Sequence, residues 1–175
     1  MTNMPLDNDY IIAQTQAMVR INSVNSDLEP GAAGEGELGR YVAQALREMG
    51  IEPQIHDIEA GRSNVIGVWE GTGRGRSLLL NAHLDTVGVT GMAEPFSGAI
   101  REGKIYGRGA VDMKASIGAM LGVMKSFVDS GTRLQGDLLF TAVIDEEYGS
   151  KGMAHLVENF SADGAIVTEP TNLRI

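Results

Sequence analysis

Residues 77–85 have the sequence SLLLNAHLD, in which an apolar run leads directly into a histidine and an aspartate. Two later stretches have the same plan, DLLFTAVIDEE at residues 137–147 and GAIVTEP at residues 164–170. Short apolar runs without polar alternation are typical of strands buried on both faces of a parallel or mostly parallel sheet. Because ligands of such sheets bind beyond the carboxyl ends of the strands, we expect these polar groups to converge on one edge.

The polar groups that follow the three runs are one imidazole and several carboxylates, namely His83, Asp85, Asp145, Glu146, Glu147 and Glu169. Crowded carboxylates repel one another and raise one another's pKa values unless cations neutralise them. The chain has no cysteine, so a bound metal would rest on histidine nitrogen and carboxylate oxygen alone. The sequence therefore predicts a metal site at this edge of the sheet.

Composition indicates what kind of protein carries this site. With 175 residues and 43% hydrophobic content, the chain suffices for one domain with a core but not for two. A formal charge of −9 with scattered Lys and Arg argues against a nucleic-acid partner. The first residues lack the pattern of a signal peptide, and no run approaches the ~18 apolar residues of a membrane span. We therefore expect a soluble, cytoplasmic protein without a membrane partner.

Helical and strand patterns alternate along the chain, which predicts an α/β layered fold. Helices are expected where apolar residues recur every three or four positions, over about residues 9–21, 38–49 and 114–128. Further strands are expected over residues 54–58 and 64–69. The glycine-rich residues 71–75 stand between two predicted strands, so we interpret them as a hairpin turn. A dinucleotide-binding loop would have to open a helix instead.

Four motifs occur in order: HLD at residues 83–85, GRGAVDMK at 107–114, DEEYG at 145–149 and TEPT at 168–171, with EPFSG at 94–98 between the first two. Together they resemble the dizinc amidohydrolase and exopeptidase family, which includes acetylornithine deacetylase, succinyl-diaminopimelate desuccinylase, aminoacylase and the glutamate-releasing carboxypeptidases. The resemblance covers the chain from about Tyr10 to its end. It implies a three-layer αβα zinc-exopeptidase-like domain with a mostly parallel central sheet.

The resemblance also implies a role for each matching residue. His83 and Glu169 are implied as ligands of one zinc ion, Glu147 as a ligand of the second, and Asp112 as the bridge between them. Glu146 is implied as the general base that takes a proton from the attacking water and passes it to the leaving nitrogen. Asp85 would orient the His83 ring by accepting its other N–H. Co²⁺ or Mn²⁺ are possible substitutes for zinc.

Plainer interpretations of the same residues stay open at this point. His83 alone could be a structural histidine at a strand end, and Asp112 could cap the helix that follows it. Residues 145–147 could be a solvated turn, an interpretation left open above all for Asp145. His56 and His155 match no motif, and we assign them to surface or packing roles.

The resemblance implies that residues 1–175 are the N-terminal part of a catalytic domain, with the fold incomplete at the C-terminus. The dimerisation or lid domain and the C-terminal catalytic segment, with a last histidine ligand, would be absent. We expect hydrolysis of an amide bond in an N-acyl amino acid or small peptide, and a homodimer when full length. This chain alone is expected to be inactive and to leave a strand edge uncovered. The alternative is a catalytically incomplete metal-binding fragment or interaction module.

Overall fold

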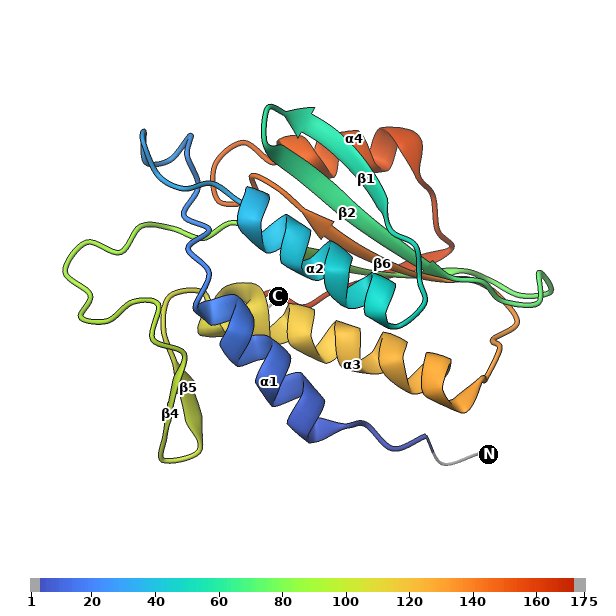
Figure 1. The fold of residues 1–175 in the computed structure, drawn as a ribbon. Coiled ribbons are helices and arrows are strands. Elements are labelled where there is room, and N and C mark those ends of the chain that lie inside the picture. Colours follow the sequence, from blue (N-terminus) through green and yellow to red (C-terminus); the bar gives the residue numbers. More distant parts are fainter. Residues whose placement is uncertain (1–3, 172–175) are drawn as a thin grey trace.

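The computed structural model describes residues 4–171. Its centre is a five-stranded sheet with strand order β1-β2-β6-β3-β7 (Figure 1). The strands are β1 (Gln54–Glu59), β2 (Arg62–Trp69), β6 (Leu138–Val143), β3 (Leu78–His83) and β7 (Gly164–Val167). β3 is parallel to β6 and to β7, whereas β2 is antiparallel to β1 and β6. Only β2 runs against the common direction, so the expected mostly parallel sheet is confirmed.

The central strands are buried because helices cover both faces of the sheet. Every residue of β6 is buried, and five of the six residues of β3 are buried. β7 is different, because it has β3 as its one neighbour and all four of its residues are exposed. Ile166 and Val167 are 46% and 50% exposed. The expectation of burial on both faces is therefore right for β3 and β6 and wrong for β7.

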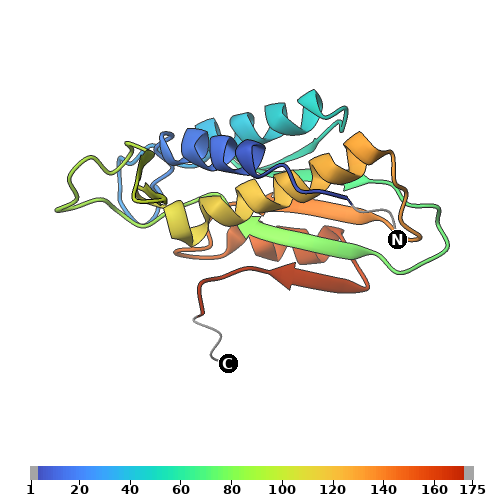
Figure 2. The ribbon, with the colours of Figure 1, turned by 90° about the horizontal axis from the view of Figure 1, so that it is seen from below.

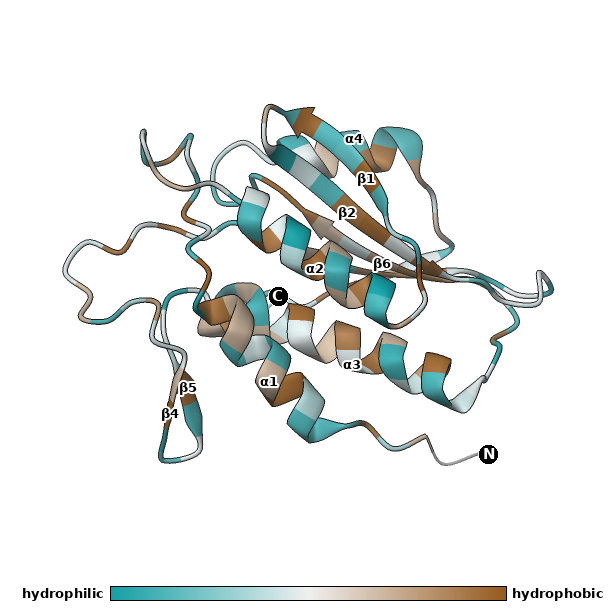
Figure 3. Cartoon of the chain, in the orientation of Figure 1, coloured by the Kyte–Doolittle hydropathy of each residue, from teal (hydrophilic) through white to brown (hydrophobic). Residues whose placement is uncertain are grey.

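Three helices cover one face of the sheet and one helix covers the other (Figure 2). The first face carries α1 (Asn8–Val19), α2 (Gly36–Glu48) and α3 (Ala115–Ser130). The second face carries α4 (Lys151–Asn159), whose Leu156 packs with Ile66 and Leu139 of the sheet. Hydrophilic and hydrophobic residues alternate along α2, as expected for an amphipathic helix (Figure 3). The three predicted helices and the αβα layers are confirmed.

α1 packs closely on α3 because two glycines of α3 face it. A β-carbon at Gly118 would overlap the side chain of Thr15, and one at Gly122 would overlap that of Ile11. The glycine after α3, Gly131, has a φ of 62°, the left-handed conformation that commonly ends a helix. This packing holds the start of α3, and the loop before it, against the sheet.

Besides the exposed strand β7 and the helix α4, which was not predicted, two features of the chain differ from the sequence-based expectation. Residues 71–75 do not form a hairpin turn, because β6 lies between β2 and β3. They belong instead to the connection between β2 and β3, which crosses the end of β6. β6 pairs with β2 on one side and with β3 on the other. The second feature is a small two-stranded arm of β4 (Ala99–Arg101) and β5 (Lys104–Tyr106), which projects from the domain and was not predicted (Figure 1).

Candidate metal centre

The predicted site residues come from four connections that meet at one edge of the sheet. His83 is the last residue of β3, Glu146 and Glu147 lie in the turn after β6, and Glu169 follows β7. Asp112 lies in η1 (Ala110–Lys114), the irregular turn that leads into α3. Since β3, β6 and β7 are parallel, their carboxyl ends place these groups together, as the sequence pattern indicates.

His83 lies at the centre of the group. Its side chain is 1% exposed, and its Nε2 atom is 3.0 Å from Asp112 Oδ1 and 3.7 Å from Glu169 Oε1. Glu146 Oε2 lies 3.9 Å from the same nitrogen. The carboxylates are partly exposed, with side-chain exposures from 32% for Glu169 to 46% for Asp112. A buried imidazole therefore faces a set of carboxylates that remain open to solvent.

Two groups of side chains have donor atoms close enough together to hold a metal ion. The first is His83, Asp112 and Glu169, and the second is His83, Glu146 and Glu147. In each group the donor atoms all lie within 4.8 Å of one another. One nitrogen and several carboxylate oxygens make a donor set that suits Zn²⁺ and also Mn²⁺ or Co²⁺. Each of the four predicted ligands belongs to at least one of these two groups.

The electrostatics of the cluster favour a bound cation. Burial raises the pKa of Glu147, and the nearby Asp112 carboxylate raises it further. Burial likewise raises the pKa of Glu169. Burial alone would lower the pKa of His83, but hydrogen bonding and attraction to Asp85, with contributions from Asp112 and Glu169, outweigh it and raise the pKa to about 9. Without a cation, protons compensate the crowded negative charge, and a divalent ion would replace them.

Asp85 lies behind His83 and does not belong to either donor group. The acceptor nearest His83 Nδ1 is the backbone carbonyl oxygen of Asp85 at 3.0 Å, while its carboxylate Oδ1 is at 3.4 Å. The expected contact with the carboxylate is therefore the longer of the two. The carboxylate also accepts the backbone N–H groups of Glu146 and Glu147, each at 3.0 Å. Asp85 thus connects the end of β3 to the turn that carries both glutamates.

Asp145 is not part of a solvated turn. Its side chain is fully buried, and its Oδ1 accepts hydrogen bonds from Asn25 at 3.0 Å and from Arg62 at 3.3 Å. Its φ of 66° turns the chain out of β6, so that the next two residues point toward the site. The solvated-turn interpretation is therefore wrong for Asp145, and the required change of direction after β6 is present.

Several buried polar residues behind the site were missed from the sequence. Arg62, whose side chain is 7% exposed, makes two hydrogen bonds of 2.7 Å to the fully buried carboxylate of Glu35. These bonds raise the pKa of Arg62 above its ordinary value. Asn25 is also fully buried and contacts both Asp85 and Asp145. No motif indicated them, because their contacts with Glu35, Asp85 and Asp145 join residues 27 to 120 positions apart in sequence.

The two other histidines lie outside the site. His56 of β1 and His155 of α4 contact each other, with 3.1 Å between His56 Nδ1 and His155 Nε2. The His56 ring also packs edge-on against Phe160. Neither residue belongs to a donor group among the described residues. Their assignment to packing roles agrees with this placement.

Comparison with known proteins identifies the family. The model of peptidase family M20/M25/M40 matches residues 79–175, which contain all the predicted ligands. The chain is a member of the M20 peptidase family. A curated relative of the M20 chain is the N-formyl-4-amino-5-aminomethyl-2-methylpyrimidine deformylase of Halalkalibacterium halodurans, 33% identical over 153 residues. That match covers 83% of this chain and 36% of the relative, so the M20 chain spans about a third of its relative's length.

Solved structures agree with the fold. Human carnosine dipeptidase 1 has a TM-score of 0.76 at 22% identity, over 95% of the M20 chain and 39% of the dipeptidase. The M20 family metallo-carboxypeptidase Sso-CP2 of Sulfolobus solfataricus has a TM-score of 0.75 at 22% identity, over 90% of the M20 chain and 36% of its own. These likenesses concern the fold, whereas the match to the peptidase family places the M20 chain in a family of metal-dependent hydrolases. Within residues 4–171, no helix combines the length and the hydropathy required to cross a bilayer.

Proposed function

We propose that this M20 chain carries most of the metal centre of a hydrolase that cleaves an amide bond of a small N-acyl compound. N-acyl amino acids, short peptides and N-formyl amines form the substrate class, the last because a curated relative is named as a deformylase. The observation that supports this proposal best is the close group of His83, Asp112 and Glu169 beside the half-exposed Glu146.

In this proposal each residue has a separate task. His83 and Glu169 would hold one zinc ion, Glu147 would hold the second, and Asp112 would be shared by both. Metal ions bound there would polarise the amide carbonyl and lower the pKa of a water molecule. Glu146 is the general base in this proposal, and the 3.9 Å between its Oε2 and His83 Nε2, with a side chain that is 45% exposed, supports that role.

Glu146 takes part in both proton transfers of the proposed reaction. Glu146 accepts a proton as the water oxygen bonds to the carbonyl carbon. It then donates that proton to the amide nitrogen as the C–N bond breaks, which yields a carboxylic acid and an amine. The buried Asp85 contacts the backbone N–H of Glu146 and so holds the base in place during these transfers.

A specific observation favours the alternative of a segment that binds metal without turnover. The two donor groups share His83, so the second group has no imidazole of its own among the described residues. We propose that the first metal is held firmly by this chain and that the second is weakly held until a further ligand is supplied. Elemental analysis after dialysis against micromolar zinc distinguishes one bound ion from two, and a chain free of metal would refute the site.

The test of the base uses two neighbouring substitutions in the complete polypeptide that contains these residues. Glu146→Gln should keep its metal and lower kcat by ~10²–10⁴-fold, the usual contribution of general-base catalysis. Glu147→Gln, the matched control, should instead lower the metal content. The assay follows amine release from N-formyl, N-acetyl and N-succinyl compounds. Equal loss of metal in both variants would refute the division of roles.

A further inference from the structure

The buried amide of Asn25 is placed between two carboxylates behind the metal centre. Its Nδ2 atom donates to Asp85 Oδ2 at 2.7 Å and to Asp145 Oδ1 at 3.0 Å. Asp85 and Asp145 are 1% and 0% exposed, so neither carboxylate can replace this donor with bulk water. Both N–H groups of the amide are therefore used to hold buried negative charge.

The orientation of this amide is fixed by its surroundings. Its Oδ1 atom accepts the backbone N–H groups of Asp27 at 2.8 Å and Leu28 at 3.2 Å. Rotation of the amide by 180° would place its oxygen against two carboxylates and its NH₂ group against two N–H donors. Each of these contacts would be repulsive. The side chain of Asn25 can therefore be accommodated in one orientation only.

The backbone of Asn25 is also tied to the strand end that carries the site. Val24 forms a parallel bridge with Thr86, and the Asn25 N–H donates to the Thr86 carbonyl at 3.0 Å. The segment before α2 therefore runs directly beside the residues that follow His83. This pairing places the Asn25 amide opposite the Asp85 carboxylate.

Asp85 connects Asn25 to the residues of the metal centre. Its Oδ2 atom, held by Asn25, also accepts the Glu147 N–H at 3.0 Å, and its Oδ1 accepts the Glu146 N–H at 3.0 Å. Burial alone would raise the pKa of Asp85, but hydrogen bonds from His83, Asn25 and the Glu147 N–H outweigh burial and lower it. Rotation of this carboxylate would release both glutamate N–H groups at once.

We infer that Asn25 is a positioning residue of the metal centre. It fixes the Asp85 carboxylate, and through it the turn that carries Glu146 and Glu147, relative to His83. This inference rests on the proposed metal-dependent hydrolase. Outer partners of metal ligands typically contribute about 10–100-fold to metal affinity or activity, which sets the expected size of the effect.

The experiment measures the binding of Co²⁺ alone to the chain, without substrate. Asn25→Asp removes both donors and adds a third carboxylate, and Asn25→Ser retains one shorter donor as a milder change. Asn22→Asp is the matched control, because it adds the same charge in the same segment, and its acceptor for the Val24 N–H at 3.1 Å is kept. Affinity is measured by competition with a chelator, and the visible absorption of Co²⁺ reports the geometry of its ligands.

We expect Co²⁺ affinity to fall about 10–100-fold in both Asn25 variants, with a changed Co²⁺ absorption spectrum, while Asn22→Asp behaves like the parent. Thermal melting is measured with EDTA and with saturating Co²⁺, which separates an effect on metal binding from an effect on the stability of the fold. The increase in Tm that Co²⁺ provides should be smaller in the Asn25 variants than in the parent. Parental affinity and spectrum in both Asn25 variants, whatever their Tm with EDTA, would overturn the inference. A parent chain that binds no Co²⁺ would overturn the proposed function itself.

Discussion

Replacement of Arg62 by methionine should destabilise this fold far more than the loss of an exposed arginine does. Arg62 lies in β2 and contacts four carboxylates, of which Glu35 and Asp145 have fully buried side chains. Methionine keeps much of the aliphatic length but removes every N–H donor of the guanidinium. The two buried carboxylates would then lose their neighbouring cation in a region that water does not reach.

The expected size follows from the burial of these partners. Removal of one partner from a buried ion pair typically costs about 3–5 kcal/mol, because the remaining charge is uncompensated. For a chain of this length, each kcal/mol lowers Tm by about 2–4 °C, so a decrease of roughly 6–20 °C is expected. A typical domain is stable by about 5–15 kcal/mol, so Arg62→Met would remove between about a fifth and all of that stability.

Thermal and urea unfolding with EDTA provide the measurement, so that metal binding does not contribute. Arg47→Met is the control, because the Arg47–Glu52 pair is 3.3 Å long with side chains 43% and 80% exposed. Exposed pairs contribute about 0–1 kcal/mol, so this variant should melt within a few degrees of the parent. If Arg62→Met lost no more stability than Arg47→Met, the reasoning from burial would be refuted.

Three further predictions concern the site, the sheet edge and the helix packing. The pKa of metal-free His83 is about 9, above its ordinary 6.5. Its protonation thus stabilises the fold fully below pH 6.5, and that contribution is lost as the pH rises through 9. Since a metal needs the neutral imidazole, Co²⁺ affinity should rise with pH up to about 9 with release of a proton. Titration calorimetry in buffers of different ionisation enthalpy measures this release, and its absence at pH 7 would contradict the prediction. Ile166→Lys places a charge on the exposed strand β7 and should reduce self-association in light scattering, whereas unchanged association would exclude this edge as the contact. Gly122→Val would overlap Ile11 and should cost about 1–3 kcal/mol in urea unfolding, while Val at the exposed Ala119 of the same helix should cost less.

The layers of the fold and the residues of the donor groups could be predicted from sequence because both depend on local patterns. Apolar runs identified β3 and β6, and the groups that follow them had to meet at one sheet edge once the strands were parallel. The assignment of His83, Asp112, Glu147 and Glu169 as ligands depended on resemblance, and the two donor groups contain all four. Their individual roles remain predictions.

The supporting residues could not be predicted, because their function depends on contacts between distant segments. Asn25 meets Asp145 across 120 positions, and nothing in the local sequence of either residue indicates the other. In the sequence Asp145 is one of three adjacent acids, whereas in the structure its fully buried side chain and its φ of 66° separate it from its neighbours. The strand order was also hidden, since a glycine-rich connection suits a hairpin as well as a crossing loop.

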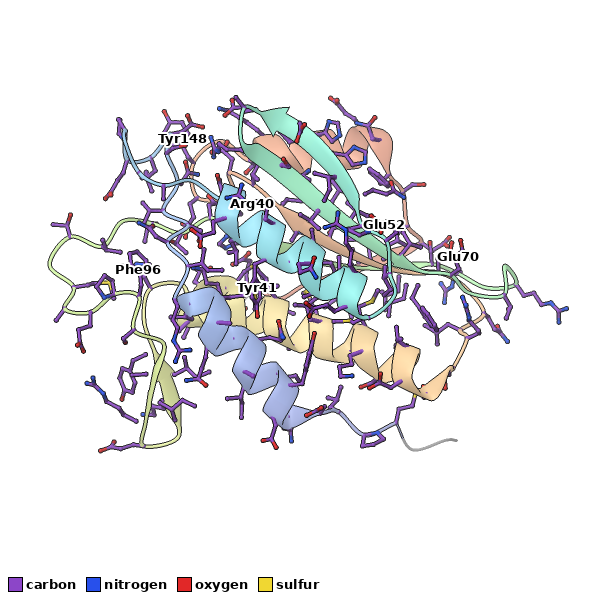
Figure 4. All side chains as sticks on the ribbon, viewed as in Figure 1. Arg40, Tyr41, Glu52, Glu70, Phe96 and Tyr148 are labelled. Atoms are coloured by element: carbon purple, nitrogen blue, oxygen red, sulfur yellow. The ribbon has the colours of Figure 1, made fainter. Side chains whose placement is uncertain are left out.

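The turn after β6 also carries a large exposed side chain toward the end of the molecule where the parallel strands finish. Tyr148 is 64% exposed there, and Phe96, from the long loop after β3, lies at the same end of the molecule (Figure 4). Aromatic side chains provide large contact areas at little cost in conformational entropy. For the proposed hydrolase, truncation of either residue to alanine would test whether that residue contacts a bound acyl compound.

The central place of β6 determines when the sheet can form during synthesis. β2 and β3 both pair with β6, yet β6 begins only at Leu138, well after β3 has ended at His83. Until then β1 and β2 can form a hairpin, but one edge of β2 and the whole of β3 remain without a partner. Such unpaired apolar strands associate readily with other chains, and non-local pairing is slow. Nascent chains that stop before Val143 should therefore be the species most dependent on chaperones.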